Sequence, residues 1–226
     1  MTKRKSIPVY EQQGIKALVF DFDGTLAVAT LDFGRMKREA LKTMARLIPL
    51  PEKLDGKLME ILEGLETEQG KEAMLPVRRA VLQTVRDLEM EAATRSSLFP
   101  YVRPMLAACR EKGLGTAIVT RNCHDALRTV FPDVDDHFAC IITRDDVERV
   151  KPAPEHLLAA LRRLGVPPEE ALMSGDHPMD VIVGKRVGSK TAALATGEAS
   201  YEDLAAENPD YCERDGTDLM RSLGIL

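Results

Sequence analysis

The feature that most constrains the fold is a series of short, uninterrupted apolar runs that end in polar residues. The first run, IKALVF at 15–20, leads directly into the segment DFDGT. Apolar runs without alternation are typical of strands that are buried on both faces of a parallel sheet. Four later runs predict further strands: GTAIVT (115–120), FACIIT (138–143), EALMSGD (170–176) and KTAALATG (190–197).

Segments with helical patterns separate the predicted strands. PYVRPMLAACREKG ends at Gly113 and APEHLLAALRRLG ends at Gly165, and each has basic residues in its last turn. Glycine just beyond the last turn and basic residues within it are typical helix C-termini. Strands that alternate with helices predict an α/β fold with a doubly wound, Rossmann-like parallel sheet.

A long segment after the first strand interrupts this alternation. Residues 30–97 contain no strand pattern, and a connection of this length is not an ordinary loop. We predict a small α-helical cap domain at 30–97, inserted into a core domain formed by 1–29 and 98–226. The apolar residues at helical spacing within it form three sets: Met36, Ala40, Leu41, Met44, Leu47 and Ile48; Leu54, Leu58, Ile61, Leu62 and Leu65; Val77, Val81, Val85 and Leu88.

Composition and charge exclude several classes of protein. The chain has 226 residues, 44% of them hydrophobic, and a net charge of −5. The single basic cluster, TKRK at 2–5, is too short to suggest nucleic-acid binding. No apolar run approaches membrane-spanning length, and the cysteines form no CxxC pair. We therefore expect a cytoplasmic protein that has no nucleic-acid or membrane partner.

Polar residues follow the predicted strands at the edge where such sheets bind ligands. Carboxylates crowded in one crevice cost about 4 kcal/mol for each close pair, so the site needs a cation. Oxygen ligands alone favour Mg²⁺ over zinc, and a lysine with hydroxyl groups suits a phosphoryl group. The candidate residues are Asp21, Asp23, Gly24 and Thr25; Thr120, Arg121 and Asn122; Lys151; and Asp176 and Asp180.

The order of these motifs resembles that of a known enzyme superfamily. DFDGT, the threonine after the second strand, KPAP and GDHPMD resemble the four signature motifs of the haloacid dehalogenase-like hydrolases. The resemblance extends from about Ile15 to the C-terminus. The inserted helices resemble the helical cap of the branch that includes phosphoglycolate phosphatase and β-phosphoglucomutase.

The resemblance implies catalytic roles for four residues. Asp21 would be the nucleophile that forms an aspartyl-phosphate intermediate. Asp23 would protonate the leaving oxygen and then deprotonate the attacking water, and its backbone carbonyl would be a metal ligand. Thr120 would donate a hydrogen bond to the phosphoryl oxygens, and Lys151 would offset their charge.

The remaining candidate residues would bind metal or substrate. Asp176 would bind Mg²⁺ directly, beside Asp21 and Asp23, and Asp180 would orient Lys151 or a metal-bound water. The predicted substrate-binding residues are Gly24, Thr25, Arg121 and Asn122.

Gly24, Arg121 and Asn122, and the nearby His177, need further comment. Gly24 would allow the backbone to approach the phosphate. Arg121 contacts either a second anionic group of the substrate or a surface carboxylate, and the role of Asn122 stays open. His177 is expected to point to solvent or toward the cap rather than to bind metal.

The predicted function is that of a Mg²⁺-dependent phosphatase acting on a small phosphorylated metabolite. Asp23 argues against dehalogenation, because true dehalogenases of the superfamily lack an acid at this position. A phosphomutase remains an alternative, as does a catalytically silent binding protein, and the chain is either a monomer or a homodimer. Basic residues of the cap could select an anionic substrate: Arg35, Lys37, Arg38, Arg78 and Arg79.

Overall fold

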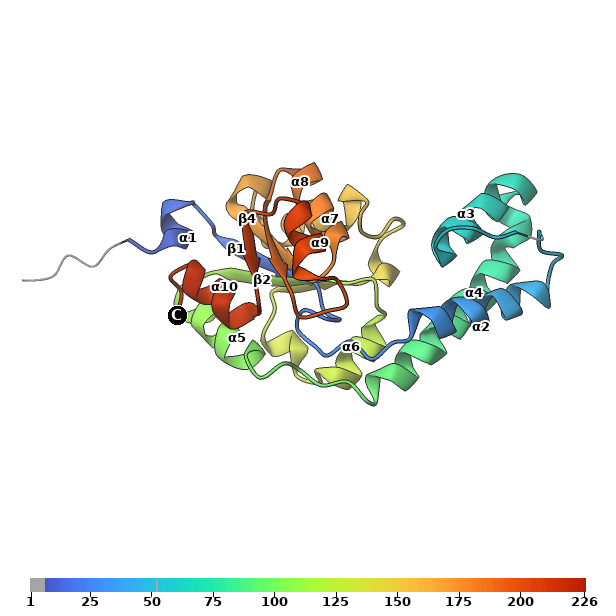
Figure 1. Ribbon diagram of the computed structural model, residues 1–226, viewed down its shortest axis with the longest axis horizontal. Coiled ribbons are helices and arrows are strands. Elements are labelled where there is room, and N and C mark those ends of the chain that lie inside the picture. The colour runs from blue at the N-terminus through green and yellow to red at the C-terminus, as the bar shows by residue number, and fades with distance from the viewer. Residues whose placement is uncertain (1–6, 52) are drawn as a thin grey trace, which may run out of the picture. The chain divides into compact units, whose positions relative to one another are not determined.

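The structure is a computed structural model that describes residues 7–51 and 53–226 (Figure 1). The basic segment at 2–5 lies outside the described residues. The chain divides into two compact units, one formed by 1–29 with 96–226 and the other by 30–95. The second boundary falls two residues before the one expected from the sequence, because Ser96 and Ser97 both hydrogen-bond Val28 of the first unit.

The first unit contains a six-stranded, all-parallel sheet in the order β3-β2-β1-β4-β5-β6. The sheet confirms the predicted doubly wound α/β fold. The chain moves from β1 outward to β3 and then returns to β4, so the strand order reverses between β1 and β4. The strands are β1 (Ala17–Phe20), β2 (Gly115–Val119), β3 (Cys140–Ile142), β4 (Ala171–Gly175), β5 (Lys190–Leu194) and β6 (Tyr211–Glu213).

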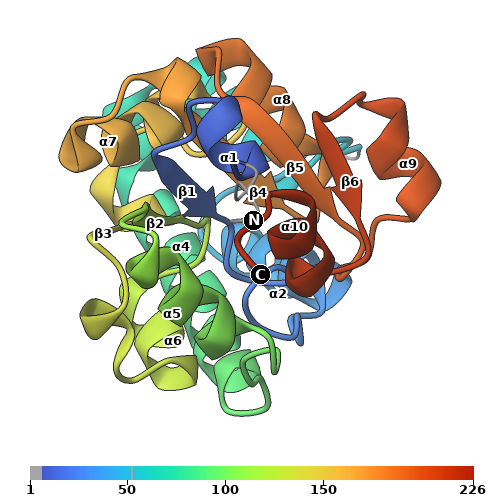
Figure 2. The same ribbon diagram turned by 90° about the vertical axis from the view of Figure 1, so that its left-hand side faces the viewer.

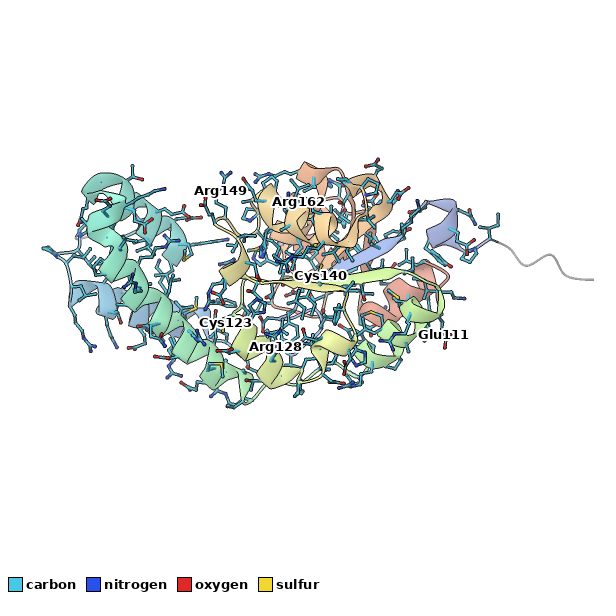
Figure 3. All side chains as sticks on the ribbon, turned by 180° about the vertical axis from the view of Figure 1, so that it is seen from behind. Glu111, Cys123, Arg128, Cys140, Arg149 and Arg162 are labelled. Atoms are coloured by element: carbon cyan, nitrogen blue, oxygen red, sulfur yellow. The ribbon has the colours of Figure 1, made fainter. Side chains whose placement is uncertain are left out.

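Helices cover both faces of the sheet, so alternate strand residues enter two different cores (Figure 2). Leu18 and Phe20 pack with α1 (Val9–Gln12), α5 (Val102–Glu111), α6 (His124–Val130) and α10 (Gly216–Ser222). Val19 packs on the opposite face with α7 (Pro154–Leu164), α8 (Pro178–Val187) and Cys140 of β3, which Figure 3 labels. Both faces are therefore apolar, as the uninterrupted runs predict.

Several elements were not predicted from the sequence. Strand β6 has only three residues, all half-buried, so it carries no apolar run. Helices α1, α6, α9 (Tyr201–Ala206) and α10 span at most seven residues, which is too short for a periodic pattern. Helix α7 ends where predicted, because Gly165 adopts the left-handed conformation with φ 67° that glycine tolerates.

The described part of the second unit, 30–51 and 53–95, contains three helices: α2 (Phe33–Ala45), α3 (Leu58–Gln69) and α4 (Lys71–Ala93). Their shared core contains Met44, Leu62 and Val81, which lie on the predicted apolar faces. Arg78 of α4 donates to Glu66 of α3 at 2.8 Å.

The two chain segments that leave and re-enter the first unit are paired with each other. Ala27 forms an antiparallel bridge with Leu98. The Val28 N–H donates to Ser97 O, and the Phe99 N–H donates to Leu26 O, both at 2.9 Å. No helix among the described residues is both long and apolar enough to cross a membrane.

Candidate active site

Asp21 is held at the carboxyl end of β1 by its own backbone and by a lysine. Its Oδ1 atom accepts from the Phe22 N–H at 2.7 Å and from Lys151 Nζ at 2.8 Å. No described residue donates to its other oxygen, Oδ2, and the side chain is 15% exposed. One oxygen is therefore oriented while the other is open to a ligand.

Lys151 is buried between two carboxylates. Its Nζ atom lies 2.8 Å from Asp21 Oδ1 and 2.7 Å from Asp180 Oδ1, and the lysine side chain is only 1% exposed. Burial alone would lower the pKa of Lys151, but the charges of Asp180 and Asp21 outweigh it and raise that pKa. The lysine is therefore a fixed cation. It lies in the loop between β3 and α7, just before α7 begins.

Asp176 follows β4 and is packed tightly against neighbouring loops. Its Oδ1 atom accepts from the hydroxyl of Thr25 at 2.9 Å. A Cβ atom at Gly24 would lie 2.2 Å from the Asp176 carboxylate, and one at Gly197 would lie 1.7 Å from it. Glycine is therefore needed at both positions, because any side chain there would collide with the Asp176 carboxylate.

These contacts show a structural role for Gly24 and Thr25 in addition to the predicted one. Thr25 is fully buried, and its hydroxyl holds Asp176 rather than facing a substrate. The Gly24 N–H donates to Ala27 O at 2.7 Å, so this amide is not free to bind a phosphate. Both residues therefore help to position the Asp176 carboxylate, and their contact with a substrate stays a prediction.

Three carboxylates converge into a cluster that suits a cation. One oxygen each from Asp21, Asp176 and Asp180 lies within 4.8 Å of the others. Burial, together with the charge of Asp21, raises the pKa values of Asp176 and Asp180, and Lys151 opposes this effect. Crowded carboxylates with raised pKa values favour a hard, oxygen-binding divalent cation such as Mg²⁺. The donor set therefore fits this ion.

Asp23 points to a different partner. Its Oδ2 atom accepts from the side-chain amide of Asn122 at 2.9 Å, and its side chain is not part of the three-carboxylate cluster. Thr120 lies beside it at the end of β2, where its hydroxyl oxygen accepts from the Asn122 N–H at 3.1 Å. That hydroxyl donates to no described acceptor, so its hydrogen is available to a ligand.

Arg121 and His177 both lie near the first turn of α8. The Arg121 Nη1 atom is 3.5 Å from the sulfur of Met179. His177, although exposed, caps the helix: its Nδ1 accepts from the Met179 N–H at 3.1 Å, and its N–H donates to Asp180 at 3.2 Å. His177 is thus the N-cap at which α8 begins, in addition to being exposed to solvent.

His156 is a part of the site that the sequence analysis missed. It is fully buried, and its Nδ1 atom accepts from the Lys151 N–H at 3.0 Å. Burial, assisted by the charge of Lys151, lowers the pKa of His156 to about 4. The ring is therefore neutral at physiological pH and fixes the backbone of the lysine. The sequence did carry a signal for its burial, because His156 lies one helical turn before Ala160 and therefore on the same, buried face of α7.

Three of the five basic residues singled out in the helical unit have partners within that unit. Arg35 pairs with Glu91 and Arg78 pairs with Glu66, each at 2.8 Å, and Lys37 donates to Gly56 O at 2.7 Å. Such pairing accounts for these charges without a ligand.

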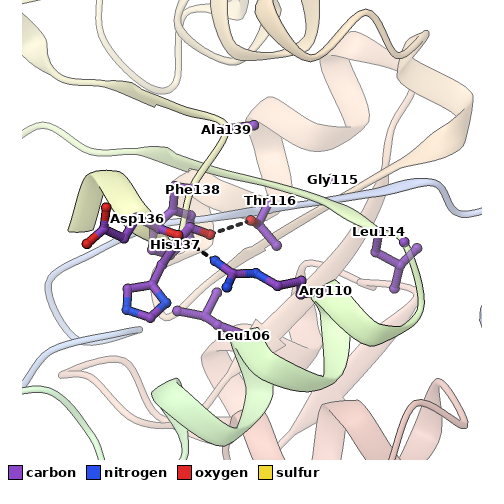
Figure 4. Close-up of a pocket in the computed structure, with 10 residues that line it drawn as sticks. Leu106, Arg110, Leu114, Gly115, Thr116, Asp136, His137, Phe138 and Ala139 are labelled. Carbon is purple, nitrogen blue, oxygen red and sulfur yellow. Dashed lines mark hydrogen bonds between the residues drawn. The ribbon is translucent and has the colours of Figure 1, made fainter. Parts of the chain in front are cut away.

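A separate pocket of about 470 Å³ lies at the opposite edge of the sheet (Figure 4). It is lined by residues that include Gly115 and Thr116, which begin β2, whereas the carboxylates lie beyond the strand ends. Arg110 and Thr116 both donate to backbone oxygens there. This pocket does not belong to the carboxylate site.

The fold and the site together define a hydrolase whose carboxylates and lysine meet at the topological switch point of a doubly wound sheet. The sequence model that describes the haloacid dehalogenase-like hydrolase family matches residues 15–188 of this chain. The chain belongs to this family and is a phosphatase. Hydrolases of this family generally use Mg²⁺, for which the acidic cluster is suited.

Similar proteins span nearly the whole chain. Pyrophosphatase PpaX of Anoxybacillus flavithermus is 30% identical over 223 residues, covering 93% of this chain and 98% of that protein. Phosphoglycolate phosphatase of Photorhabdus laumondii is 26% identical, covering 94% of each chain. The crystal structure of CbbY from Rhodobacter sphaeroides in complex with phosphate is 25% identical, with a TM-score of 0.62, and covers 93% and 99%.

Proposed function

We propose that the chain is a Mg²⁺-dependent phosphatase that hydrolyses a small phosphorylated metabolite through a covalent intermediate on Asp21. The observation that carries the proposal is the asymmetry of this carboxylate. Its Oδ1 atom is fixed by Phe22 and Lys151, while Oδ2 accepts from no described donor. An ionised carboxylate needs no base for activation, so a fixed and partly exposed oxygen suits a nucleophile.

In the first step, Asp21 Oδ2 forms a bond to phosphorus as the bond to the leaving oxygen breaks. Asp23 would supply the proton that the leaving oxygen takes up, and Asn122 holds its carboxylate at 2.9 Å. In the second step, Asp23 would accept a proton from water as the water oxygen attacks phosphorus. The bond between phosphorus and Asp21 then breaks, which releases phosphate, restores the Asp21 carboxylate and leaves Asp23 protonated for the next cycle.

The other residues would offset charge and orient the groups. Lys151 would neutralise part of the phosphoryl charge, and Thr120 would donate its free hydroxyl hydrogen to a phosphoryl oxygen. Asp21 and Asp176 would hold Mg²⁺, with Asp180 beside them and the Asp23 backbone carbonyl as a further ligand. The ion would reduce the repulsion between the carboxylates and the substrate.

The substrate class rests on the relatives. One is named a pyrophosphatase and another a phosphoglycolate phosphatase. Pyrophosphate and phosphoglycolate are both small, and in both a phosphoryl group is attached to a compact leaving group. We therefore expect one of these compounds, or a close chemical analogue, to be the preferred substrate.

The proposal is tested by measuring phosphate release from pyrophosphate, phosphoglycolate and a series of sugar phosphates. We expect release with Mg²⁺ and none with EDTA. Preference for a sugar phosphate would contradict the substrate class. Absence of release from all compounds, followed by isomerisation of a sugar phosphate in the presence of a bisphosphate primer, would identify a phosphomutase instead.

We also expect Mg²⁺ to stabilise the protein against unfolding, because it binds carboxylates that repel each other in the folded chain. At a hundredfold excess over its Kd, a ligand adds about 2.7 kcal/mol, which raises the melting temperature by about 5–10 °C. Calorimetry with Mg²⁺ and with EDTA measures this shift. Asp176→Asn should abolish this shift. In EDTA the variant should melt close to the wild-type temperature, because burial raises the pKa of Asp176 to about 8 and its carboxyl is largely uncharged near neutral pH.

The matched control for this prediction is Asp145→Asn, which changes a carboxylate that is 52% exposed. This variant should keep the full Mg²⁺ shift. An Asp176→Asn protein that still responds to Mg²⁺ would place the metal elsewhere.

A further inference from the structure

Arg121 occupies an unusual position for a cation. It directly follows Thr120 at the end of β2 and is half-buried. Its guanidinium lies against Met179 in the first turn of α8, between Asp176 and Asp180 in sequence. The side chain thus extends from β2 toward the helix that carries two of the site carboxylates.

The guanidinium has no carboxylate partner among the residues that the structure describes. Its recorded contact is with the sulfur of Met179 at 3.5 Å, a weak acceptor for a group with five N–H donors. The nearby carboxylates have other partners. Lys151 pairs with Asp21 and Asp180, the Thr25 hydroxyl donates to Asp176, and the Asn122 amide donates to Asp23. By contrast, Arg35, Arg103 and Arg128 each pair with a carboxylate.

The backbone beneath Arg121 is fixed on both sides. Arg144 Nη1 donates to Arg121 O at 3.2 Å, and the next residue, Asn122, bonds both Thr120 and Asp23. A half-buried guanidinium that has a fixed backbone and no neighbouring anion loses part of its hydration, and no protein group replaces the lost water contacts. This arrangement suits a site that receives its anion from a ligand.

We propose that Arg121 binds a second anionic group of the substrate, which the leaving group carries next to the transferred phosphoryl group. This inference rests on the proposed function and deepens it. The planar guanidinium fork matches two oxygens of either a carboxylate or a phosphate. Phosphoglycolate would supply a carboxylate, and pyrophosphate would supply a second phosphate. Phosphate esters of neutral leaving groups would leave Arg121 without a partner.

The test compares substrates with and without the second anion. We would measure kcat/KM of the wild type and of Arg121→Gln for pyrophosphate, phosphoglycolate and 4-nitrophenyl phosphate, with Mg²⁺ present. The ratio of kcat/KM for an anionic substrate to that for 4-nitrophenyl phosphate should fall by about 10- to 100-fold in the variant, as expected for a lost charge-assisted hydrogen bond. The two anionic substrates distinguish a carboxylate from a phosphate as the preferred group.

Arg128→Gln is the matched control. Arg128 lies on α6, is 44% exposed and pairs with Asp135 at 3.2 Å (Figure 3). This variant should leave the substrate ratios unchanged. An equal loss for all three substrates with Arg121→Gln would overturn the inference, because Arg121 would then act on the transferred phosphoryl group. Unchanged ratios would also overturn it.

A binding measurement separates this inference from the proposed function. In the Asp21→Asn background with Mg²⁺, titration calorimetry should give tighter binding of pyrophosphate than of orthophosphate. Adding Arg121→Gln should remove this preference. If the wild type hydrolyses none of the compounds, the proposed function fails, and the calorimetric preference alone decides the inference. Equal Kd values for the two ligands would overturn it.

Discussion

Replacing Asp21 with asparagine should lower kcat for phosphate release by ~10⁴-fold or more. Asparagine keeps an oxygen that accepts from the Phe22 N–H and from Lys151, which lie 2.7 and 2.8 Å from Oδ1 in the wild type. The position of Oδ2 then holds an amide nitrogen that cannot attack phosphorus. The loss should therefore appear in kcat while the fold is retained.

Two measurements make this prediction decisive. Acid-quenched wild-type enzyme should carry a phosphoryl group on the peptide that contains Asp21, detectable by mass spectrometry, and the variant should not. Asp135→Asn, a change at a carboxylate that is 64% exposed, should keep activity within about twofold of the wild type. Activity of Asp21→Asn within about tenfold of the wild type would mean that water attacks the substrate directly.

Lys151→Met should reduce both activity and stability. Losing the cation that faces the phosphoryl group is expected to lower kcat/KM by about 10²- to 10³-fold. It also leaves Asp180, which is 0% exposed, without the ammonium that lies 2.7 Å away. Removing one partner of a buried ion pair costs about 3–5 kcal/mol of unfolding free energy. Chemical denaturation with and without the substitution measures this cost.

The stability loss should depend on pH in a defined direction. Burial raises the pKa of Asp180 to about 6 even though the charge of Lys151 opposes the rise. Without Lys151, folded Asp180 holds its proton to higher pH than the unfolded chain does, so stability falls as pH increases. The difference between wild type and variant should be larger at about pH 8 than at about pH 5. An equal difference at both values would contradict the ion-pair argument.

A double variant separates the two effects of Lys151. Adding Asp180→Leu to Lys151→Met removes the uncompensated carboxylate and should recover most of the lost stability, because apolar groups replace buried ion pairs at little cost. Activity should remain low. Recovery of activity together with stability would show that Lys151 acts only on folding.

The sequence predicted the elements whose signals are local. β1 and β2 were recognisable because a strand buried on both faces needs a continuous apolar run, and Gly165 marked the end of α7. β6 was missed because its three half-buried residues form no such run. Edge strands of this kind are defined by pairing with their neighbour, which here is β5.

Within the site, the structure brings Asp21, Lys151, Asp176 and Asp180 together as the sequence predicted, but the contacts of the individual residues were not predictable. Thr25 and Asp176 are separated by 151 positions, so their hydrogen bond follows from the sheet order and not from a local pattern. Gly24 was assigned to backbone approach to a phosphate, whereas the structure shows that a Cβ there would collide with Asp176. His156 looked like an isolated histidine until the fold placed its ring against the Lys151 backbone.

The pairing of Ala27 with Leu98 has a consequence for how such a chain can diversify. Antiparallel partners lie about 5 Å apart and can be joined by a two-residue hairpin turn. Residues 30–95 therefore form a unit that could be removed or replaced as a whole, because the two chain ends left by its removal already lie next to each other. We therefore expect that segments of different length could be exchanged at this position without shifting the register of β1 against β2 and β4.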